Sequence, residues 1–353
     1  MVAQRKPVLP SLFLFSKVSF SSPQNLFIMQ TPKPCCGVDV SHLSLAVCYQ
    51  NNLGELFHLQ VGNNKKGFEK ILEHTGTHYH FVMEATGVYY IRLAFFLHQH
   101  GCTLSVVNAL SIKRFIQMHL ERSKSDKKDA AWICRYGIER RPQAWQMPDS
   151  AYFEGKQLYN AIREYQEQIK RFNNQLHSLL LLPIVSSDTI KSLERLKRQL
   201  QKEMKALEQK LQALLEQWQP DQLKNISSIK GLGKRAAAVL IVFTQGFKNT
   251  QNHRQLISFA GLSPTEHNSG TSIKGSNSIC KHGGKQLRNV LYMCAMNAMK
   301  TNPACKALYD RLKAKGKTGK QGLMAVSNKL LKQAFAVVKN NTLYQPNYCS
   351  TKP

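Results

Sequence analysis

The stretch Gly37-Val-Asp-Val-Ser41 decides the fold of the first part of the chain, because it sets a carboxylate within an apolar run. Residues 37–49 alternate in character and are rich in Val and Leu, which predicts a β-strand. Turn residues at 51–54 separate this strand from a second predicted strand at 55–61. Asp39 is therefore expected on a strand, with an apolar neighbour on each side.

Strands and helices alternate over the following residues. We expect a short helix at 67–74, a strand at 80–84, a helix at 86–100 that stops at Gly101, and a strand at 102–108. This alternation is typical of an α/β layer domain, which we assign to residues 34–148. Residues 1–33 are interpreted as a disordered or mis-annotated extension, with the folded protein beginning near Met29.

The rest of the chain is predicted to be mostly helical. Residues 149–219 are rich in Gln, Lys, Glu, Arg and Leu, with one break at Pro183. Their second half repeats an apolar residue every three or four positions: Leu193, Leu196, Leu200, Met204, Leu207, Leu211, Leu214 and Trp218. This seam predicts an antiparallel helical hairpin or a dimeric coiled coil. Short helices with Gly-containing turns follow, so we assign a helical domain to 220–341 and a tail to 342–353.

The chain is strongly basic, with 49 Lys and Arg against 21 Asp and Glu, a net charge of +28. From Asp221 onward there are 21 Lys and Arg and three Asp and Glu, so 18 of those 28 excess charges lie there. This field favours a polyanion, and we expect DNA. A membrane is disfavoured, because no stretch offers about 18 uninterrupted apolar residues. The 9 cysteines are scattered and form no C-x-x-C pair, which favours reduced thiols in the cytoplasm. For a DNA-binding protein we also expect association with the bacterial nucleoid.

Four carboxylates form the sharpest constellation: Asp39, Glu84, Asp126 and Asp129. Glu84 ends a predicted strand, while Asp126 and Asp129 open a predicted helix and share one face at their i,i+3 spacing. Acids that meet in one cleft repel each other unless a hard cation neutralises them, and carboxylate oxygens suit Mg²⁺. Each acid alone has a plainer explanation: Asp126 suits a helix N-terminus, and Asp39 suits a turn or an edge strand.

These acidic segments resemble the DEDD transposases of bacterial insertion sequences (the insertion-sequence 110/1111 group) and the Piv-type DNA invertases. The matching segments are Gly37-Val-Asp-Val-Ser, Met83-Glu-Ala-Thr-Gly-Val-Tyr and Lys124-Ser-Asp-Lys-Lys-Asp-Ala. The resemblance runs from about Cys36 to about Lys339 and implies a resolvase-like first domain of the RNase H-like fold, with the four acids as its catalytic tetrad. It also implies DNA transposition, Mg²⁺ (or Mn²⁺ in its place) and a structured guide RNA.

The basic domain contains a Gly-x-Gly turn between two predicted helices, within residues 226–240. Gly231 and Gly233 allow a phosphate to approach the backbone, where the amides of the next helix, Lys234 and Arg235 can hold it. The pattern resembles a helix-hairpin-helix, which binds DNA without reading its sequence. A plain turn between two helices is the alternative.

A polar, Gly-rich loop follows at 259–272 and runs into the basic segment 279–291. From its residues alone it is a surface loop, but its pattern resembles the hallmark of the family's second domain. The resemblance implies a serine nucleophile at Ser269, with Ser272 and Ser263 as alternatives, and a serine needs a nearby base or metal. The cations expected to bind phosphates beside the cleaved bond, unless they only aid solubility, are Lys274, Lys281, Lys285 and Arg288.

We therefore expect a Mg²⁺-dependent transposase or site-specific recombinase that exchanges DNA strands through a serine and assembles as a homodimer or tetramer. The alternative is a nuclease like a Holliday-junction resolvase, which hydrolyses DNA without covalent attachment. Two further alternatives are a non-enzymatic DNA-binding or regulatory protein descended from such an enzyme, and an RNA-binding structural protein. A trapped protein–DNA adduct separates the first two, and Mg²⁺-dependent DNA cleavage excludes the others.

Overall fold

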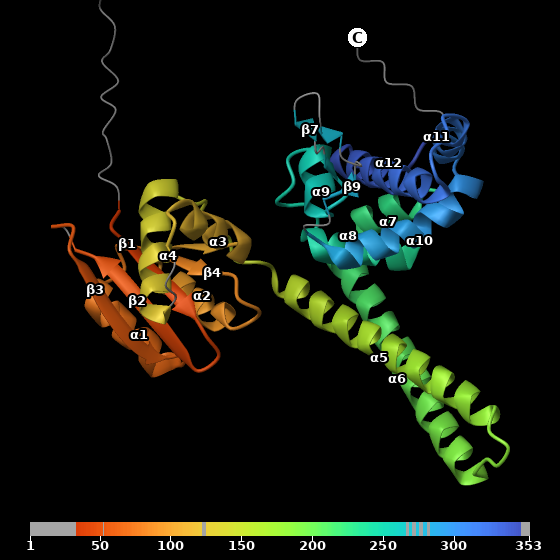
Figure 1. Cartoon of the computed structure of the whole chain (residues 1–353), viewed down its shortest axis with the longest axis horizontal. Coiled ribbons are helices and arrows are strands. Elements are labelled where there is room, and N and C mark those ends of the chain that lie inside the picture. Colours follow the sequence, from red (N-terminus) through yellow and green to blue (C-terminus); the bar gives the residue numbers. More distant parts are fainter. Residues whose placement is uncertain are drawn as a thin grey trace, which may run out of the picture. The chain divides into compact units, whose positions relative to one another are not determined.

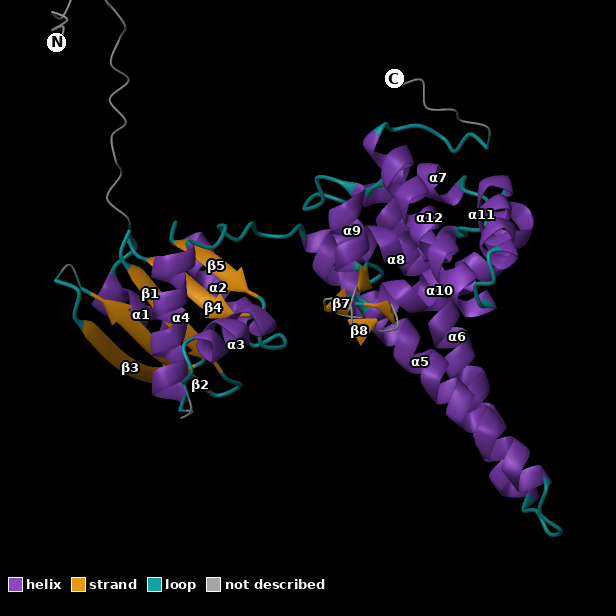
Figure 2. Ribbon diagram, turned by 45° about the horizontal axis from the view of Figure 1, so that its top comes forward, coloured by secondary structure: helices purple, strands orange, loops and turns teal. Residues whose placement is uncertain are grey.

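The computed structural model describes residues 33–51, 53–121, 125–265, 268–269, 273–274, 278–280 and 283–346. The N-terminal extension expected at 1–33 lies outside these residues apart from its last one. The chain divides into two compact units, Met1–Met147 and Pro148–Pro353 (Figures 1 and 2). No helix of the described residues is long and apolar enough to cross a membrane.

The first unit is a five-stranded mixed sheet with helices on both faces, so the predicted α/β class is confirmed. The strand order is β3-β2-β1-β4-β5, in which β2 is antiparallel to both β1 and β3, whereas β4 and β5 run parallel to β1. The strands are β1 (Cys35–Val40), β2 (Ser44–Gln50), β3 (Leu56–Gly62), β4 (His80–Glu84) and β5 (Thr103–Val107).

Two pairs of helices cover the sheet. One face packs against α1 (Lys65–Thr75) and α2 (Tyr90–Gln99), and the other against α3 (Ala109–Met118) and α4 (Asp126–Arg140). Helix α2 begins four residues later than expected, after the turn that follows Glu84, and α3 was not predicted. Strand β3 at the side of the sheet remains mostly exposed, including Leu56 at 51% and Phe57 at 43%.

The prediction of one strand at 37–49 is wrong, because β1 and β2 are separate strands joined by a tight turn at 41–43. Ser41 closes this turn by accepting a hydrogen bond from the Ser44 amide at 3.1 Å. The turn contains no Gly, Pro, Asn or Asp, and the alternation of polar and apolar residues continues through it to Leu43, which is 76% exposed. The sequence pattern therefore concealed the reversal of the chain.

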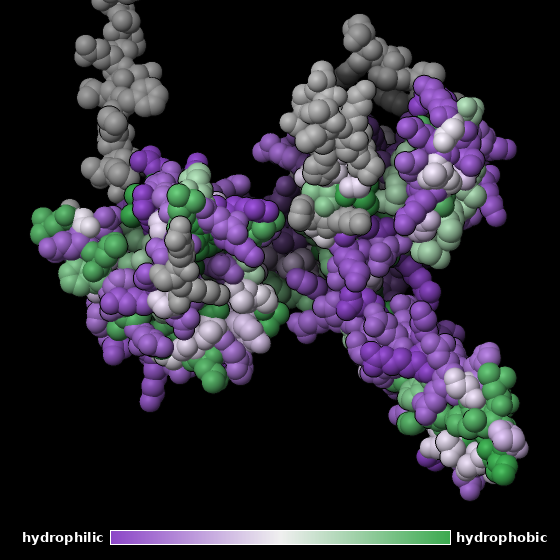
Figure 3. Space-filling model, in the orientation of Figure 1, coloured by the Kyte–Doolittle hydropathy of each residue, from purple (hydrophilic) through white to green (hydrophobic). Residues whose placement is uncertain are grey.

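The second unit begins with a helical hairpin of α5 (Ser150–Leu180) and α6 (Ser187–Trp218), which pack against each other. Its base enters the core of the unit through Ile162 and Leu215. At its far end the side chains are exposed and apolar, as Figure 3 shows: Leu180, Leu181, Leu182 and Ile184. The predicted pair of helices is thus present within one chain, and dimerisation through it stays a prediction.

The rest of this unit is mostly helical, as expected. Its centre is α8, in which residues 236–242 are buried. The helices are α7 (Pro220–Ser227), α8 (Lys234–Thr244), α9 (His253–Phe259), α10 (Lys285–Thr301), α11 (Pro303–Ala314) and α12 (Gly319–Lys339). Two short antiparallel pairs join them, β6 (Pro264–Thr265) with β9 (Ser278–Ile279) and β7 (Asn268–Ser269) with β8 (Ile273–Lys274).

Candidate active site and nucleic-acid groove

Two of the predicted acids lie at the carboxyl ends of neighbouring parallel strands, β1 and β4, in the sheet of the first unit. Strand β1 pairs with β4 in a register that sets Val38 opposite Met83. Asp39 and Glu84 are the next residues of the two strands, and both side chains are half-buried. Adjacent strands lie about 4.8 Å apart, so the two carboxylates start from neighbouring backbone positions.

Asp39 and Glu84 also face the same side of the sheet, which is the side covered by α4. Side chains alternate along a strand, so Glu84 shares a face with Val82, which packs against Ala130 and Cys134 of α4. Asp39 shares a face with Gly37, where an added Cβ would lie 2.2 Å from the Cys134 nitrogen. Both carboxylates therefore extend into the layer occupied by α4.

Helix α4 runs antiparallel to β1, and this direction brings its first turn to the acidic edge. A Cβ at Gly137 would meet the Cys35 sulfur, whereas a Cβ at Gly37 would meet Ala130 and Cys134. From Gly37 to Asp39 the strand advances about 6.6 Å, a rise that takes about four residues of helix. Asp39 is thus level with the first turn of α4, which contains Asp126 and Asp129.

Local hydrogen bonds fix the ends of these elements. Ser125 caps α4, accepting a hydrogen bond from the Lys128 amide at 3.3 Å, and Thr86 donates one to Glu84 at 3.2 Å. The positive end of the helix dipole favours carboxylates in this first turn. Among the described residues no three His, Cys, Asp or Glu side chains are grouped closely enough to ligate a metal. The ends of β1 and β4 and the first turn of α4 thus bring the four acids to neighbouring backbone positions, but the side chains of these described residues do not form a metal-binding cluster in this arrangement. Their carboxylate oxygens are of the donor type that Mg²⁺ prefers.

The cysteines beneath α4 have a different character from the acids. Cys134 donates a hydrogen bond to the Cys35 carbonyl at 3.3 Å. The hydrogen bond with Cys35 and burial raise the pKa of Cys134 to about 12, so its thiol stays protonated at neutral pH. A protonated thiol is neither a metal ligand nor a nucleophile. Cys134 therefore offers neither a metal ligand nor a nucleophile at neutral pH.

Asn63, which was not predicted, ties together the two loops that follow Asp39 and Glu84. Its side chain is 8% exposed and donates hydrogen bonds to the carbonyls of Ser41 at 2.8 Å and Tyr89 at 3.3 Å. Its backbone amide donates to the Leu43 carbonyl at 2.9 Å. The sequence signal was a polar residue directly after a strand, but its partners are distant in sequence.

The structure describes little of the serine loop. Ser269 lies in β7 and pairs through its backbone with Ile273 of β8, but its side chain and that of Lys274 lie outside the described residues. Ser272 and Lys281 are also outside them. Ser263 is described, and its carbonyl accepts a hydrogen bond from the Cys280 amide at 2.8 Å. The roles predicted for this loop therefore stay predictions.

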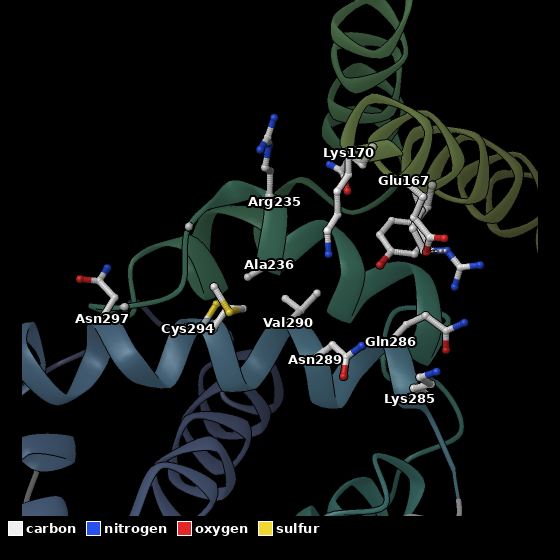
Figure 4. A pocket seen from close by; sticks show the side chains of 16 residues that line it. Glu167, Lys170, Arg235, Ala236, Lys285, Gln286, Asn289, Val290, Cys294 and Asn297 are labelled. Carbon is white, nitrogen blue, oxygen red and sulfur yellow. Dashed lines mark ion pairs between the residues drawn. The ribbon is translucent and has the colours of Figure 1, made fainter. Parts of the chain in front are cut away.

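The second unit contains a groove of about 790 Å³ between α5, the turn before α8, and α10, here named the α5–α10 groove (Figure 4). Among the described residues, the lining contains one carboxylate, Glu167, and four cations: Arg163, Lys170, Arg235 and Lys285. Its α10 wall presents Gln286, Asn289, Val290, Met293, Cys294 and Asn297. The predicted Gly231, Gly233, Arg235 and Lys285 all line this groove, and Lys234 lines an adjoining one of about 530 Å³.

The two glycines of the turn differ in their surroundings. Gly231 has φ +99°, and a Cβ there would lie 2.5 Å from the Ala298 Cβ of α10, so this residue packs the turn against the helix. A Cβ at Gly233 would have nothing within 4 Å, which leaves that backbone open to a phosphate. Among the two, Gly233 is the better candidate for the predicted phosphate contact.

The predicted cations also divide by what they contact. Arg235, 74% exposed, forms an ion pair with Glu208 of α6. The Arg288 guanidinium donates to the carbonyls of Ala260 at 3.0 Å and Gly283 at 3.3 Å, and Arg288 is not among the residues that line the groove. Arg288 therefore secures the loop before α10, whereas the predicted phosphate contact fits Arg235 and Lys285 better.

Comparison with known proteins matches both units, although the first match extends past the boundary at Met147 and through α5. A family model described as "Transposase" matches residues 36–183, which include all four acids. A second, described as "Transposase IS116/IS110/IS902 family", matches residues 223–310, which include the Gly-x-Gly turn and the serine loop. The protein is thus a transposase, an enzyme of the class that moves DNA. Within that class, the chain belongs to the IS110 family of DEDD transposases.

Individual relatives support this family. The pilin gene-inverting protein of Moraxella lacunata is 29% identical over 323 residues, covering 88% of this chain and 97% of the relative. The counterpart from Moraxella bovis is 28% identical over 318 residues, with the same coverage. The insertion element IS110 uncharacterized 43.6 kDa protein of Streptomyces coelicolor is 35% identical over 141 residues, 40% of this chain and 34% of that protein.

Proposed function

We propose that the protein cleaves and exchanges DNA strands at the ends of an insertion sequence, in a Mg²⁺-dependent reaction with Ser269 as nucleophile. The observation that carries the proposal is the position of Asp39 and Glu84 at one sheet edge, level with the first turn of α4, which contains Asp126 and Asp129. The strand order with β2 antiparallel supports an RNase H-like catalytic domain.

The four acids would hold Mg²⁺, and their oxygen donors suit it. When bound, Mg²⁺ supplies positive charge that activates a nucleophile and stabilises the developing negative charge on phosphate oxygens. The protein's own contribution is positional. The sheet fixes Asp39 and Glu84, helix α4 presents Asp126 and Asp129, and Asn63 keeps the two strand ends together.

In the covalent step the Ser269 oxygen attacks phosphorus and forms a phosphoserine ester. The bond between phosphorus and one sugar oxygen breaks, and the departing sugar oxygen takes up a proton as the serine loses one. The reverse attack, by a sugar hydroxyl of a second strand, releases Ser269 and completes the exchange without net hydrolysis. Because an unperturbed serine is a poor nucleophile, this step requires a base or a metal.

Binding of the substrate falls to the basic second unit in this proposal. Gly233, Lys234, Arg235 and Lys285 would bind the DNA backbone at the open turn and at the start of α10. A structured RNA would guide the choice of DNA. The exposed apolar tip of the hairpin, Leu180–Ile184, is consistent with assembly into a dimer or tetramer.

The test is cleavage of supercoiled DNA that contains the element's ends, with Mg²⁺ and RNA from the flanking region. Wild-type protein should form a covalent protein–DNA adduct that survives denaturation, and both Asp126→Ala and Ser269→Ala should abolish it. Glu139→Gln, at the opposite end of α4, is the matched control and should keep full activity. Cleavage that is lost in Asp126→Ala but persists in Ser269→Ala, with no adduct in any protein, would instead indicate a hydrolytic nuclease.

A further inference from the structure

The α5–α10 groove has the size of a single strand rather than of a duplex. Its volume of about 790 Å³ falls within the range of small-ligand clefts, about 300–1,000 Å³. A duplex keeps its bases stacked inside and offers their edges only through its own grooves. A groove of this volume can contact base faces only if the bases are unpaired.

The cations of the groove come from all three helices that form its walls, α5, α8 and α10. Arg163 and Lys170 come from α5, Arg235 from α8 and Lys285 from the first turn of α10. Figure 4 shows Lys170 extending from α5 toward α10. With Glu167 as the one carboxylate in the lining, the groove favours a chain of phosphates.

Arg163 is left with an unsatisfied donor. Its Nε is buried and has no hydrogen-bond partner among the described residues, since the Glu167 oxygen lies 4.0 Å away. The Arg163 side chain is nevertheless 43% exposed, so the guanidinium can turn outward. A phosphate would then satisfy it through a bidentate pair.

The α10 wall offers groups that suit base edges and base faces. Gln286, Asn289, Met293 and Asn297 recur at three- and four-residue intervals, so they share one face of the helix. Asn and Gln amides can both donate to and accept from a base edge. Met293 is 62% exposed and gives an apolar contact for a base face.

We propose that the α5–α10 groove binds an unpaired DNA strand, with phosphates on Arg163, Lys170 and Lys285 and bases against Asn289 and Met293. The identity of the strand as DNA rests on the proposed function, in which a strand must leave its duplex to be exchanged. The groove would hold that displaced strand.

The test measures binding of a fluorescein-labelled 12-nucleotide DNA strand by anisotropy over a range of KCl concentrations, with the full chain. Asn289→Leu should weaken binding about tenfold, yet leave binding of an abasic strand of equal length unchanged. Arg163→Gln should weaken binding of both strands and reduce the slope of log K against log salt by about 0.7. Arg163→Lys, which keeps the charge, should retain most of that slope.

Lys202→Gln, an exposed cation of α6 that does not line the groove, is the control and should not distinguish normal from abasic strands. The proposal is overturned if Asn289→Leu weakens a duplex of the same sequence as much as the single strand, or behaves like Lys202→Gln. Preferential loss of a 12-nucleotide RNA would overturn the assignment to DNA. Asp126→Ala should bind the strand normally, so a failure of catalysis leaves this result interpretable.

Discussion

The acids of the first unit and the cations of the second unit are positioned by different kinds of constraint. Asp39 and Glu84 are positioned by the register of β1 and β4, which is set by backbone hydrogen bonds between the two strands. The groove cations come from three helices that meet only through packing of the core around α8. The acids therefore depend on the pairing of two strands and the packing of one helix, whereas the groove cations depend on the packing of three helices in the core of the second unit.

This difference explains which residues were found from sequence. Each acid occurs within a strand or helix signal, so its position could be assigned. The second unit contains many cations, and nothing in their local sequence marks Arg163 and Lys170, on the hairpin, as partners of Lys285. Conversely, Arg288 resembles a phosphate ligand in sequence but holds the carbonyls of Ala260 and Gly283.

Gly37→Ala should have the largest effect on stability and on cleavage, because it disrupts the close contact between β1 and α4. The new Cβ would lie 2.2 Å from the Cys134 nitrogen and 2.5 Å from the Ala130 oxygen, so the helix must move away from the sheet. We expect a loss of about 3 kcal/mol in unfolding free energy and loss of DNA cleavage, because Asp126 and Asp129 move with α4. Denaturant unfolding and the plasmid assay measure the two effects.

Val38→Ala is the matched control, since Val38 is fully buried on the opposite face of the same strand. It should cost about 2 kcal/mol by leaving a cavity, yet keep Mg²⁺-dependent cleavage at low temperature. Equal loss of cleavage in both variants, at a temperature where both are folded, would show that the position of α4 is not what matters.

The fold could be predicted from the sequence where an element has an ordinary sequence signal, and it could not where the signal is unusual or comes from distant residues. The strand at 80–84 could be predicted with its observed bounds, because a short apolar run in the sequence ends there at Glu84. The turn at 41–43 was missed, because Ser41 forms it through a side-chain hydrogen bond rather than through Gly or Pro. Asn63 was missed for a tertiary reason, since its partners Ser41 and Tyr89 are 22 and 26 residues away.

The next effect in size concerns the turn that begins the groove. Gly231→Ala should lower the unfolding free energy by about 2 kcal/mol, because it combines a positive φ of 99° with a 2.5 Å contact to Ala298. Gly233→Ala adds a methyl group to open space and should leave stability within about 0.5 kcal/mol. Calorimetry of both variants checks the contrast. Similar destabilisation by the two would contradict the separate roles assigned to these glycines.

Asn63→Ala should have a smaller effect on stability and a specific effect on the metal. Losing the two bonds to the loops after Asp39 and Glu84 should cost about 1–2 kcal/mol and raise the half-saturating Mg²⁺ concentration for cleavage about tenfold. Asn51→Ala is the control, because Asn51 holds the β2–β3 turn at the opposite edge of the sheet through hydrogen bonds from Leu53 and Glu55. An equal change in Mg²⁺ dependence in both variants would remove Asn63 from its positioning role.

The smallest effect is expected at Asp149, which ties the base of the hairpin to the helical core that forms the groove. Its carboxylate accepts hydrogen bonds from Lys248 at 2.6 Å and from Trp218 at 3.0 Å, and these bonds, the first above all, lower the pKa of Asp149. Because the Asp149 side chain is 39% exposed, solvent screens the pair. Asp149→Asn should therefore cost no more than about 1 kcal/mol at pH 7.

The sign of the pH dependence follows from the lowered pKa of Asp149 in the folded state. Its stabilisation is complete above the unfolded pKa of about 3.9 and disappears as the pH falls through the lower, folded value. The difference in melting temperature between wild type and Asp149→Asn should thus be present at pH 7 and shrink toward zero below that range. Asp188→Asn, in the first turn of α6, is the control. If the Asp149→Asn difference stayed constant down to low pH, the ionised carboxylate would not be what secures the hairpin to the core.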